Sequence, residues 1–201
     1  MAFTLPVGGG GGDFKRVPAG THLAICNIVA DLGVQPGSSM YPDPKRKVYL
    51  RFEIPSERIE YERDGQTVNG PATISREFTA SMNEKATLRK FLEGWRGRKF
   101  TDDEAAKFDI GSVLGKPCLL SITETEKGGE VYSNIGSASP LIRGMTAEKP
   151  ENELLLYTDE SPACFDRLPK RVKEKIQAQI PPRTEAQRDE ELSQSHDPWL
   201  D

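Results

Sequence analysis

Residues 46–54 read RKVYLRFEI, and from Lys47 on the apolar row at every second position alternates with Lys, Tyr, Arg and Glu. A β-strand places successive side chains on opposite faces, so this period of two predicts a strand with one buried face. The apolar face carries Val48, Leu50, Phe52 and Ile54. The other face carries Lys47, Tyr49, Arg51 and Glu53. The segment therefore predicts a strand that packs on a core and turns charged groups toward solvent.

The sequence on either side predicts further strands. Residues 21–34 are apolar and β-branched and lie between turn residues, which is typical of a long strand. Residues 58–63 and 72–80 predict two strands joined through Asp64-Gly65, because Asp-Gly supplies the positive φ of tight hairpins. Residues 116–125 and 130–138 predict a second hairpin around a Lys-Gly-Gly turn. Strands therefore precede and follow the middle of the chain.

The middle of the chain has the period of a helix. Asn83 is a favoured N-cap for residues 84–95, where apolar side chains recur at every third or fourth position. These side chains are Ala86, Leu88, Phe91, Leu92 and Trp95. Thr101, followed by three acidic residues, predicts the start of a short second helix that ends near Phe108.

The predicted order is three strands, a helical insert and two strands. An OB-fold has this order: it is a five-stranded barrel with its helix between the third and fourth strands, and its surface often binds oligonucleotides. The predicted fold class is therefore mainly β, an OB-fold-like barrel. A small meander or sandwich with a helical excursion has the same order and is the alternative.

Length and composition predict one domain with appendages, since the chain has 201 residues, of which 36% are hydrophobic and 29% charged. Residues 1–12 end in five glycines and predict a flexible leader. Residues 13–140 form the predicted barrel domain, and residues 141–183 form a C-terminal extension with a basic helix at 166–179. Residues 184–201 hold six acidic residues and one basic residue, which predicts a disordered acidic tail.

The sequence lacks the signatures of several large protein classes. No window holds the ~20 consecutive apolar residues of a membrane-spanning helix, and the first residues lack the pattern of a secretory signal. The three cysteines form no CxxC, and phosphate-loop, GxSxG and HExxH motifs are absent. We therefore expect a soluble cytoplasmic protein that is not an enzyme and has no catalytic residue, metal site, cofactor or membrane contact.

Basic and aromatic residues on the predicted strand at 46–54 favour nucleic-acid binding. Single-stranded nucleic acid is held by cations that follow the phosphates and by aromatic faces on which bases stack. Tyr49 lies between Lys47 and Arg51 on the predicted solvent face, and Lys45 and Arg46 extend the positive charge. These five residues predict a stacking platform, although an ordinary exposed strand carries similar residues.

A second basic group follows the predicted helix. Arg96, Arg98 and Lys99 lie in a glycine-bearing turn from which they could reach a DNA backbone, and a solvated helix end is the alternative. Tyr132, on a late strand, is a further candidate for base stacking. Tyr61 and Phe78 are better explained as residues of the core or the barrel rim.

The tail carries a resemblance to a known family. Residues 183–201 read RTEAQRDEELSQSHDPWLD and are acidic, with an apolar Trp199-Leu200 pair. Residues 91–122, FLEGWRGRKFTDDEAAKFDIGSVLGKPCLLSI, resemble a stretch of phage-encoded OB-fold proteins of replication and recombination modules. An acidic tail behind an OB-fold is similar to the plan of single-stranded DNA-binding proteins of bacteria and phages. The resemblance implies that Asp197, Trp199 and Leu200 recruit replication or recombination proteins.

The residues and the resemblance together predict a phage single-stranded DNA-binding protein in the cytoplasm of a bacterial host. It would coat DNA without sequence preference, with a cationic and aromatic surface for DNA and the tail for partners. The alternative is a recombination accessory factor whose OB-like domain binds another protein. Oligomeric state, binding-site size, the preference for DNA or RNA and the identity of the tail's partner stay open.

Overall fold

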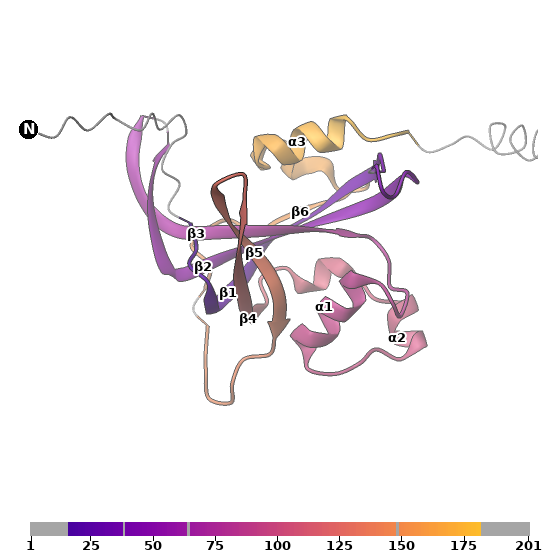
Figure 1. Cartoon of the computed structure of the whole chain (residues 1–201), viewed down its shortest axis with the longest axis horizontal. Coiled ribbons are helices and arrows are strands. Elements are labelled where there is room, and N and C mark those ends of the chain that lie inside the picture. Colours follow the sequence, from indigo (N-terminus) through magenta and orange to yellow (C-terminus); the bar gives the residue numbers. More distant parts are fainter. Residues whose placement is uncertain (1–15, 38, 64, 148, 182–201) are drawn as a thin grey trace, which may run out of the picture.

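The computed structural model describes residues 16–37, 39–63, 65–147 and 149–181, without the side chains of residues 62 and 63. Its main feature is a curled antiparallel sheet of five strands (Figure 1). The strands are β1 (Gly20–Gln35), β2 (Lys45–Arg63), β3 (Gln66–Thr79), β4 (Pro117–Lys127) and β5 (Glu130–Ser139). They lie in the order β3-β2-β1-β4-β5. The predicted mainly β class is confirmed, and the predicted strands at 46–54 and 58–63 are parts of one long strand.

The sheet curls into an OB-like half-barrel around one core. The predicted alternation of β2 places Val48, Leu50, Phe52 and Ile54 in this core. The sheet order ends at β3 and β5, and a side chain connects these two strands. The Arg76 guanidinium on β3 donates to the carbonyl oxygens of Ile135 at 2.7 Å and Gly136 at 3.1 Å on β5. Arg76 thus connects the two end strands through hydrogen bonds from its side chain to the β5 backbone, although β3 and β5 share no ladder of backbone hydrogen bonds.

A helical insert between β3 and β4 covers the open side of the core. It consists of α1 (Thr87–Arg96), α2 (Asp102–Ala106) and the 3₁₀ turn η1 (Ile110–Val113). Phe91 and Trp95 of α1 pack on Phe52, with ring centroids 6.1 Å and 5.4 Å from the Phe52 ring. The prediction that α1 starts at residue 84 is wrong. Asn83 caps a separate turn by accepting from the Lys85 N–H at 3.1 Å, so the helix begins at Thr87.

The C-terminal extension packs on the opposite face of the same sheet (Figure 1). It contains β6 (Leu155–Tyr157), the 3₁₀ turn η2 (Pro162–Arg167) and α3 (Lys170–Gln177). The sequence did not predict β6, which pairs in parallel with β1. The predicted helix at 166–179 is shorter, because Pro169 interrupts the chain between η2 and α3. The predicted leader at 1–12 and acidic tail at 184–201 lie outside the described residues.

A second core lies between the sheet and the extension. It consists of Ile28, Ala30, Leu32, Tyr49, Leu155, Tyr157, Cys164, Leu168, Val172 and Ile176. The sheet is therefore buried on both faces along much of β1. This arrangement decides which parts of the barrel surface remain accessible to a ligand.

Candidate nucleic-acid interface

The predicted stacking platform on β2 does not exist as a solvent face. Tyr49 is 9% exposed and belongs to the core beneath the extension. The prediction of an exposed tyrosine between two cations is therefore wrong. The physical reason is that β6, η2 and α3 cover the outward face of β2, a contact that the local alternation does not reveal.

The three cations at the start of β2 remain near solvent, and each has a local partner. The Lys47 ammonium donates to Thr79 Oγ1 at 3.0 Å. Arg46 Nε donates to Asp31 Oδ2 at 2.9 Å, and this hydrogen bond raises the pKa of Arg46. Lys45 Nζ lies 5.9 Å from the centroid of the Tyr41 ring. These groups lie at the β1–β2 connection and form no cationic row with Tyr49.

Arg51 lies deeper, at the edge of the extension. Its Nε donates to Asn27 Oδ1 at 3.2 Å, and burial lowers the pKa of its guanidinium. Two residues further along the same face, the fully buried Glu53 carboxylate accepts from the backbone N–H groups of Glu151 and Asn152 at 2.8 Å and 2.7 Å. The outward face of β2 is thus polar at this end and apolar at Tyr49.

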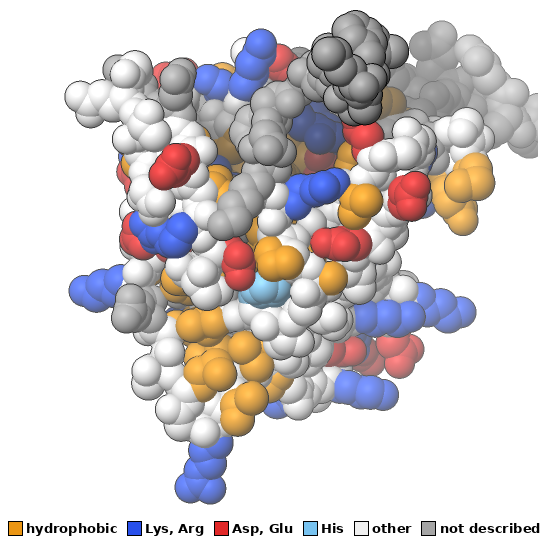
Figure 2. All heavy atoms as spheres, turned by 60° about the vertical axis from the view of Figure 1, so that its left-hand side comes forward, with side chains coloured by type: hydrophobic (Ala, Val, Ile, Leu, Met, Phe, Trp, Pro, Cys, Tyr) orange, Lys and Arg blue, Asp and Glu red, His pale blue; other side chains and the backbone are white. Residues whose placement is uncertain are grey.

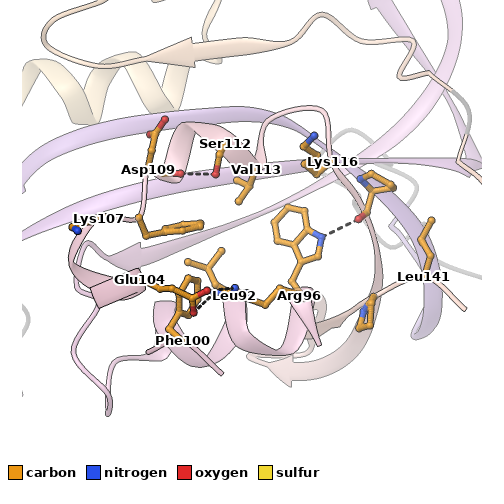
Figure 3. A pocket seen from close by; sticks show the side chains of 14 residues that line it. Leu92, Arg96, Phe100, Glu104, Lys107, Asp109, Ser112, Val113, Lys116 and Leu141 are labelled. Carbon is orange, nitrogen blue, oxygen red and sulfur yellow. Dashed lines mark hydrogen bonds and ion pairs between the residues drawn. The ribbon is translucent and has the colours of Figure 1, made fainter. Parts of the chain in front are cut away.

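One carboxylate, Glu104, pairs with two of the three cations of the predicted basic turn after α1, and Figure 3 shows its contact with Arg96. Glu104 Oε1 accepts from Arg96 at 3.1 Å and from Arg98 at 2.8 Å. Hydrogen bonds from the Thr101 backbone, Arg96 and Arg98 lower the pKa of Glu104 to about 2. Arg96 also lies over the Phe100 ring, 4.1 Å from its centroid. Of the three predicted DNA contacts here, Lys99 is exposed, whereas Arg96 and Arg98 are engaged within the fold.

A large groove of about 900 Å³ runs beside β3 and β5 and reaches the extension. Three arginines and two tyrosines line it: Arg16, Arg51, Arg167, Tyr61 and Tyr132. They come from four parts of the chain, namely the segment before β1, the strands β2 and β5, and η2. Small polar side chains of β3 and β5, among them Thr73 and Ser133, line the same groove. The groove therefore combines cations, aromatic rings and hydrogen-bonding groups.

Carboxylates and backbone oxygens hold several of these groups in place. Arg167 forms an ion pair with Glu153, and Arg16 donates to the carbonyl oxygen of Val131. The Tyr132 hydroxyl donates to Glu130 at 2.7 Å, and this hydrogen bond raises the pKa of Tyr132. Tyr132 is nevertheless 46% exposed, so its ring is accessible.

Two of the predicted DNA-binding residues, Arg51 and Tyr132, meet in this groove. The sequence interpretation placed Tyr61 in the core or the rim and did not consider Arg16 or Arg167. No local pattern links these residues, because residues 16 and 167 come together only through the docking of the extension on the barrel. In the sequence, Arg16 and Arg167 are isolated cations beside apolar segments, and this is the one signal that could have pointed to them.

The side of the molecule that carries His22, the one histidine in the described part of the chain, is shown in Figure 2. Acidic and basic side chains are interspersed there, and hydrophobic side chains gather below the histidine. The His22 ring makes structural contacts, with Nε2 2.9 Å from the Pro18 carbonyl oxygen and Nδ1 3.7 Å from Glu57.

The cysteines have the properties of core residues. Cys26, Cys118 and Cys164 are free and buried, and burial raises the pKa of the Cys26 thiol to about 12. In the described residues, no group of three or more His, Cys, Asp and Glu side chains is placed to hold a metal ion. The same part of the chain contains no helix with the length and apolar character needed to cross a membrane.

The fold and the groove define a mainly β protein with an OB-like half-barrel and an arginine- and tyrosine-lined groove. No protein-family model matches the chain, and no curated protein is significantly similar to it.

Proposed function

We propose that the protein binds single-stranded DNA, without sequence preference, in the groove beside β3 and β5. The observation that carries the proposal is the meeting of three arginines and two tyrosines from four parts of the chain in one groove. Arginine matches phosphate oxygens with two parallel hydrogen bonds, and bases of any sequence stack on aromatic rings. The groove brings these two kinds of group together, as non-specific binding of a single strand requires.

Each side chain has a role in this proposal. Tyr132, with its accessible ring, stacks on a base, and Tyr61 supports a neighbouring base. Arg16 and Arg167 bind phosphates. Arg51, held by Asn27, lies deeper in the groove and binds the DNA strand there. Glu153 keeps Arg167 in position in the free protein, and a phosphate takes the place of this carboxylate on binding. The proposed role is binding and involves no catalytic step.

The wider role is part of the same proposal. The resemblance of the tail supports a phage protein of DNA replication or recombination, acting in the cytoplasm of a bacterial host. Asp197, Trp199 and Leu200, the predicted partner-binding residues, lie outside the described residues. Their recruitment of replication or recombination proteins is supported by the sequence alone.

Fluorescence anisotropy with a labelled single-stranded oligonucleotide, and with a duplex of equal length, tests the proposal. Tyr132→Ala should weaken single-strand binding about 5- to 150-fold, which corresponds to the roughly 1–3 kcal/mol of one base stack. Arg167→Gln should reduce the slope of log affinity against log salt by about 0.7, because one phosphate contact is lost. Lys90→Gln, an exposed change on α1, is the matched control and should bind as the wild type does.

The opposite charge change gives a further check. Glu153→Gln releases Arg167 from its ion pair and should strengthen binding at low salt. If Tyr132→Ala and Arg167→Gln bind like the wild type, the groove is not the DNA site. Equal affinity for the duplex would contradict the preference for single strands.

A further inference from the structure

An apolar pocket of about 610 Å³ lies at the helical insert (Figure 3). Its apolar lining includes Leu92, Trp95, Phe100, Phe108, Val113 and Leu141. None of the residues that line this pocket lines the groove. A volume of this size falls within the ~300–1,000 Å³ of pockets that bind small ligands or side chains. The pocket is therefore a second binding surface that the proposed function does not use.

Two lysines flank this pocket. Lys107 and Lys116 are exposed and lie on different sides of it (Figure 3). In the described part of the chain, neither lysine forms an ion pair. Of the two carboxylates of the lining, Glu104 is paired with Arg96 and Arg98, whereas Asp109 keeps its charge while it accepts from the Gly111 N–H at 2.8 Å. The pocket therefore fits a ligand with an apolar centre and negative charge at its ends.

We propose that residues 197–201 of the same chain bind in this pocket. The segment reads DPWLD, so Trp199 and Leu200 form an apolar pair between two aspartates. The indole and isobutyl groups would fill the apolar lining, and Asp197 and Asp201 would lie against Lys107 and Lys116. The two aspartates of the segment are thus matched in number by the two exposed lysines of the pocket.

The length of chain allows this contact. Fifteen residues, 182–196, connect the last described residue to the segment. At roughly 3.3–3.6 Å per residue, such a connection spans up to about 50 Å. A domain of this size has a radius of gyration of about 15 Å and hence a diameter of about 40 Å, which the extended connection exceeds.

The character of the two surfaces favours the pocket over the groove as the place for this segment. The groove lining contains three arginines, Glu153 and several hydroxyl groups, which an indole would desolvate without replacing their hydrogen bonds. The pocket lining is mostly apolar and holds Trp95, whose indole N–H already donates to the Pro117 carbonyl oxygen at 2.9 Å. Docking of the segment would keep Trp199 away from partner proteins until a partner or high salt displaces it.

Nuclear magnetic resonance on the ¹⁵N-labelled full chain tests this contact. The chain has two tryptophans, so Trp199→Ala leaves one indole N–H signal, that of Trp95. The expected result is a shift of the Trp95 signal between the wild type and Trp199→Ala. A peptide of residues 192–201, added to the Trp199→Ala chain, should move the Trp95 signal back toward its wild-type position. The same peptide with alanine in place of its tryptophan should have no effect.

Charge reversal tests the role of the lysines. Lys107→Glu with Lys116→Glu, combined with Trp199→Ala, should raise the peptide concentration needed for half of the shift about tenfold. Lys85→Glu with Lys90→Glu, also exposed and of equal charge, is the matched control and should leave that concentration unchanged. Thermal unfolding of every variant checks that the fold is retained.

Three results would overturn the proposal. One is an unchanged Trp95 signal in Trp199→Ala together with no effect of the peptide. Another is a peptide that shifts residues of the groove in place of residues of the pocket. The third is a wild-type shift that grows with protein concentration, since that would place the segment in a different copy of the chain. The DNA-binding measurements are separate, so either proposal can fail without the other.

Discussion

Tyr49, Arg51 and Glu53 occupy alternate positions on the outward face of β2, yet they have three different environments. Tyr49 lies in the core under the extension, Arg51 borders the groove, and Glu53 is fully buried with hydrogen bonds to the chain at residues 151 and 152. One local pattern thus produces a core residue, a candidate DNA contact and an anchor. The difference arises from which part of the extension lies over each side chain.

Tyr49→Ala is expected to lower the free energy of unfolding by about 3 kcal/mol, because a buried aromatic ring is removed from the second core. Tyr49→Phe keeps the ring and should change stability by less than about 1.5 kcal/mol. Urea denaturation of both variants measures the difference. A change below about 0.5 kcal/mol for Tyr49→Ala would be that of a surface residue and would contradict the burial of this ring.

Among the elements, α2 shows how a five-residue helix is held in place. Thr101 Oγ1 accepts from the Glu104 N–H at 3.2 Å, and the Glu104 carboxylate accepts from the Thr101 N–H at 3.1 Å. This reciprocal pair is a capping box, as the Thr-Asp-Asp-Glu sequence predicts. The same carboxylate also binds Arg96 and Arg98, so it fastens the end of α1 to the start of α2.

Stability should therefore depend on pH through Glu104. Its pKa is lowered from 4.5 to about 2, so the ionised form stabilises the fold at pH values above the ordinary pKa. Glu104→Gln retains the capping geometry but removes the charge, and it should be less stable than the wild type at pH 7. The difference should shrink as the pH falls below 4.5 and vanish as it passes about 2.

Urea denaturation of both chains at pH 7, 4 and 2.5 measures this difference. Asp103→Gln, an exposed change in the same helix, is the control for loss of an acidic group from the first turn. A difference between Glu104→Gln and the wild type that is equal at all three pH values would show that the ion pairs with Arg96 and Arg98 do not contribute.

At the scale of the whole molecule, the extension is part of the folded body and shares the sheet with the barrel. β6 joins β1, and two cores lie on the two faces of the sheet. Glu53 connects the barrel to the extension, because its carboxylate accepts from two backbone N–H groups and from the Asn152 side chain. The groove depends on this connection, since Asn152, Glu153 and Arg167 belong to the extension and line it.

Glu53→Gln places an amide N–H₂ group toward these donors and should lower the free energy of unfolding by about 1–3 kcal/mol. Residues 141–153 should also become more susceptible to limited proteolysis, and single-strand affinity should fall because Arg167 loses its position. Glu60→Gln, an exposed change on the same strand, should have little effect. Unchanged stability and proteolysis would show that the extension is held without Glu53.

The sequence by itself determined the order of strands and helices. The alternation of residues 46–54, the capping box at Thr101 and the glycine turns are properties of neighbouring residues, and the backbone responds to them locally. The start of α1 was predicted three residues early, because Asn83 caps either a turn or a helix. Local signals thus established the OB-like order of elements, which the structure confirms.

Only the tertiary structure decided which face of the sheet is covered and where a groove forms. Tyr49 became a core residue because a segment more than 100 positions later packs on it. Arg16, Arg51 and Arg167 share one groove because the segment before β1, the strand β2 and the turn η2 come together beside β3 and β5. Burial depends on which segments pack against each other, and the periodicity of one strand does not specify which distant segment will pack on it.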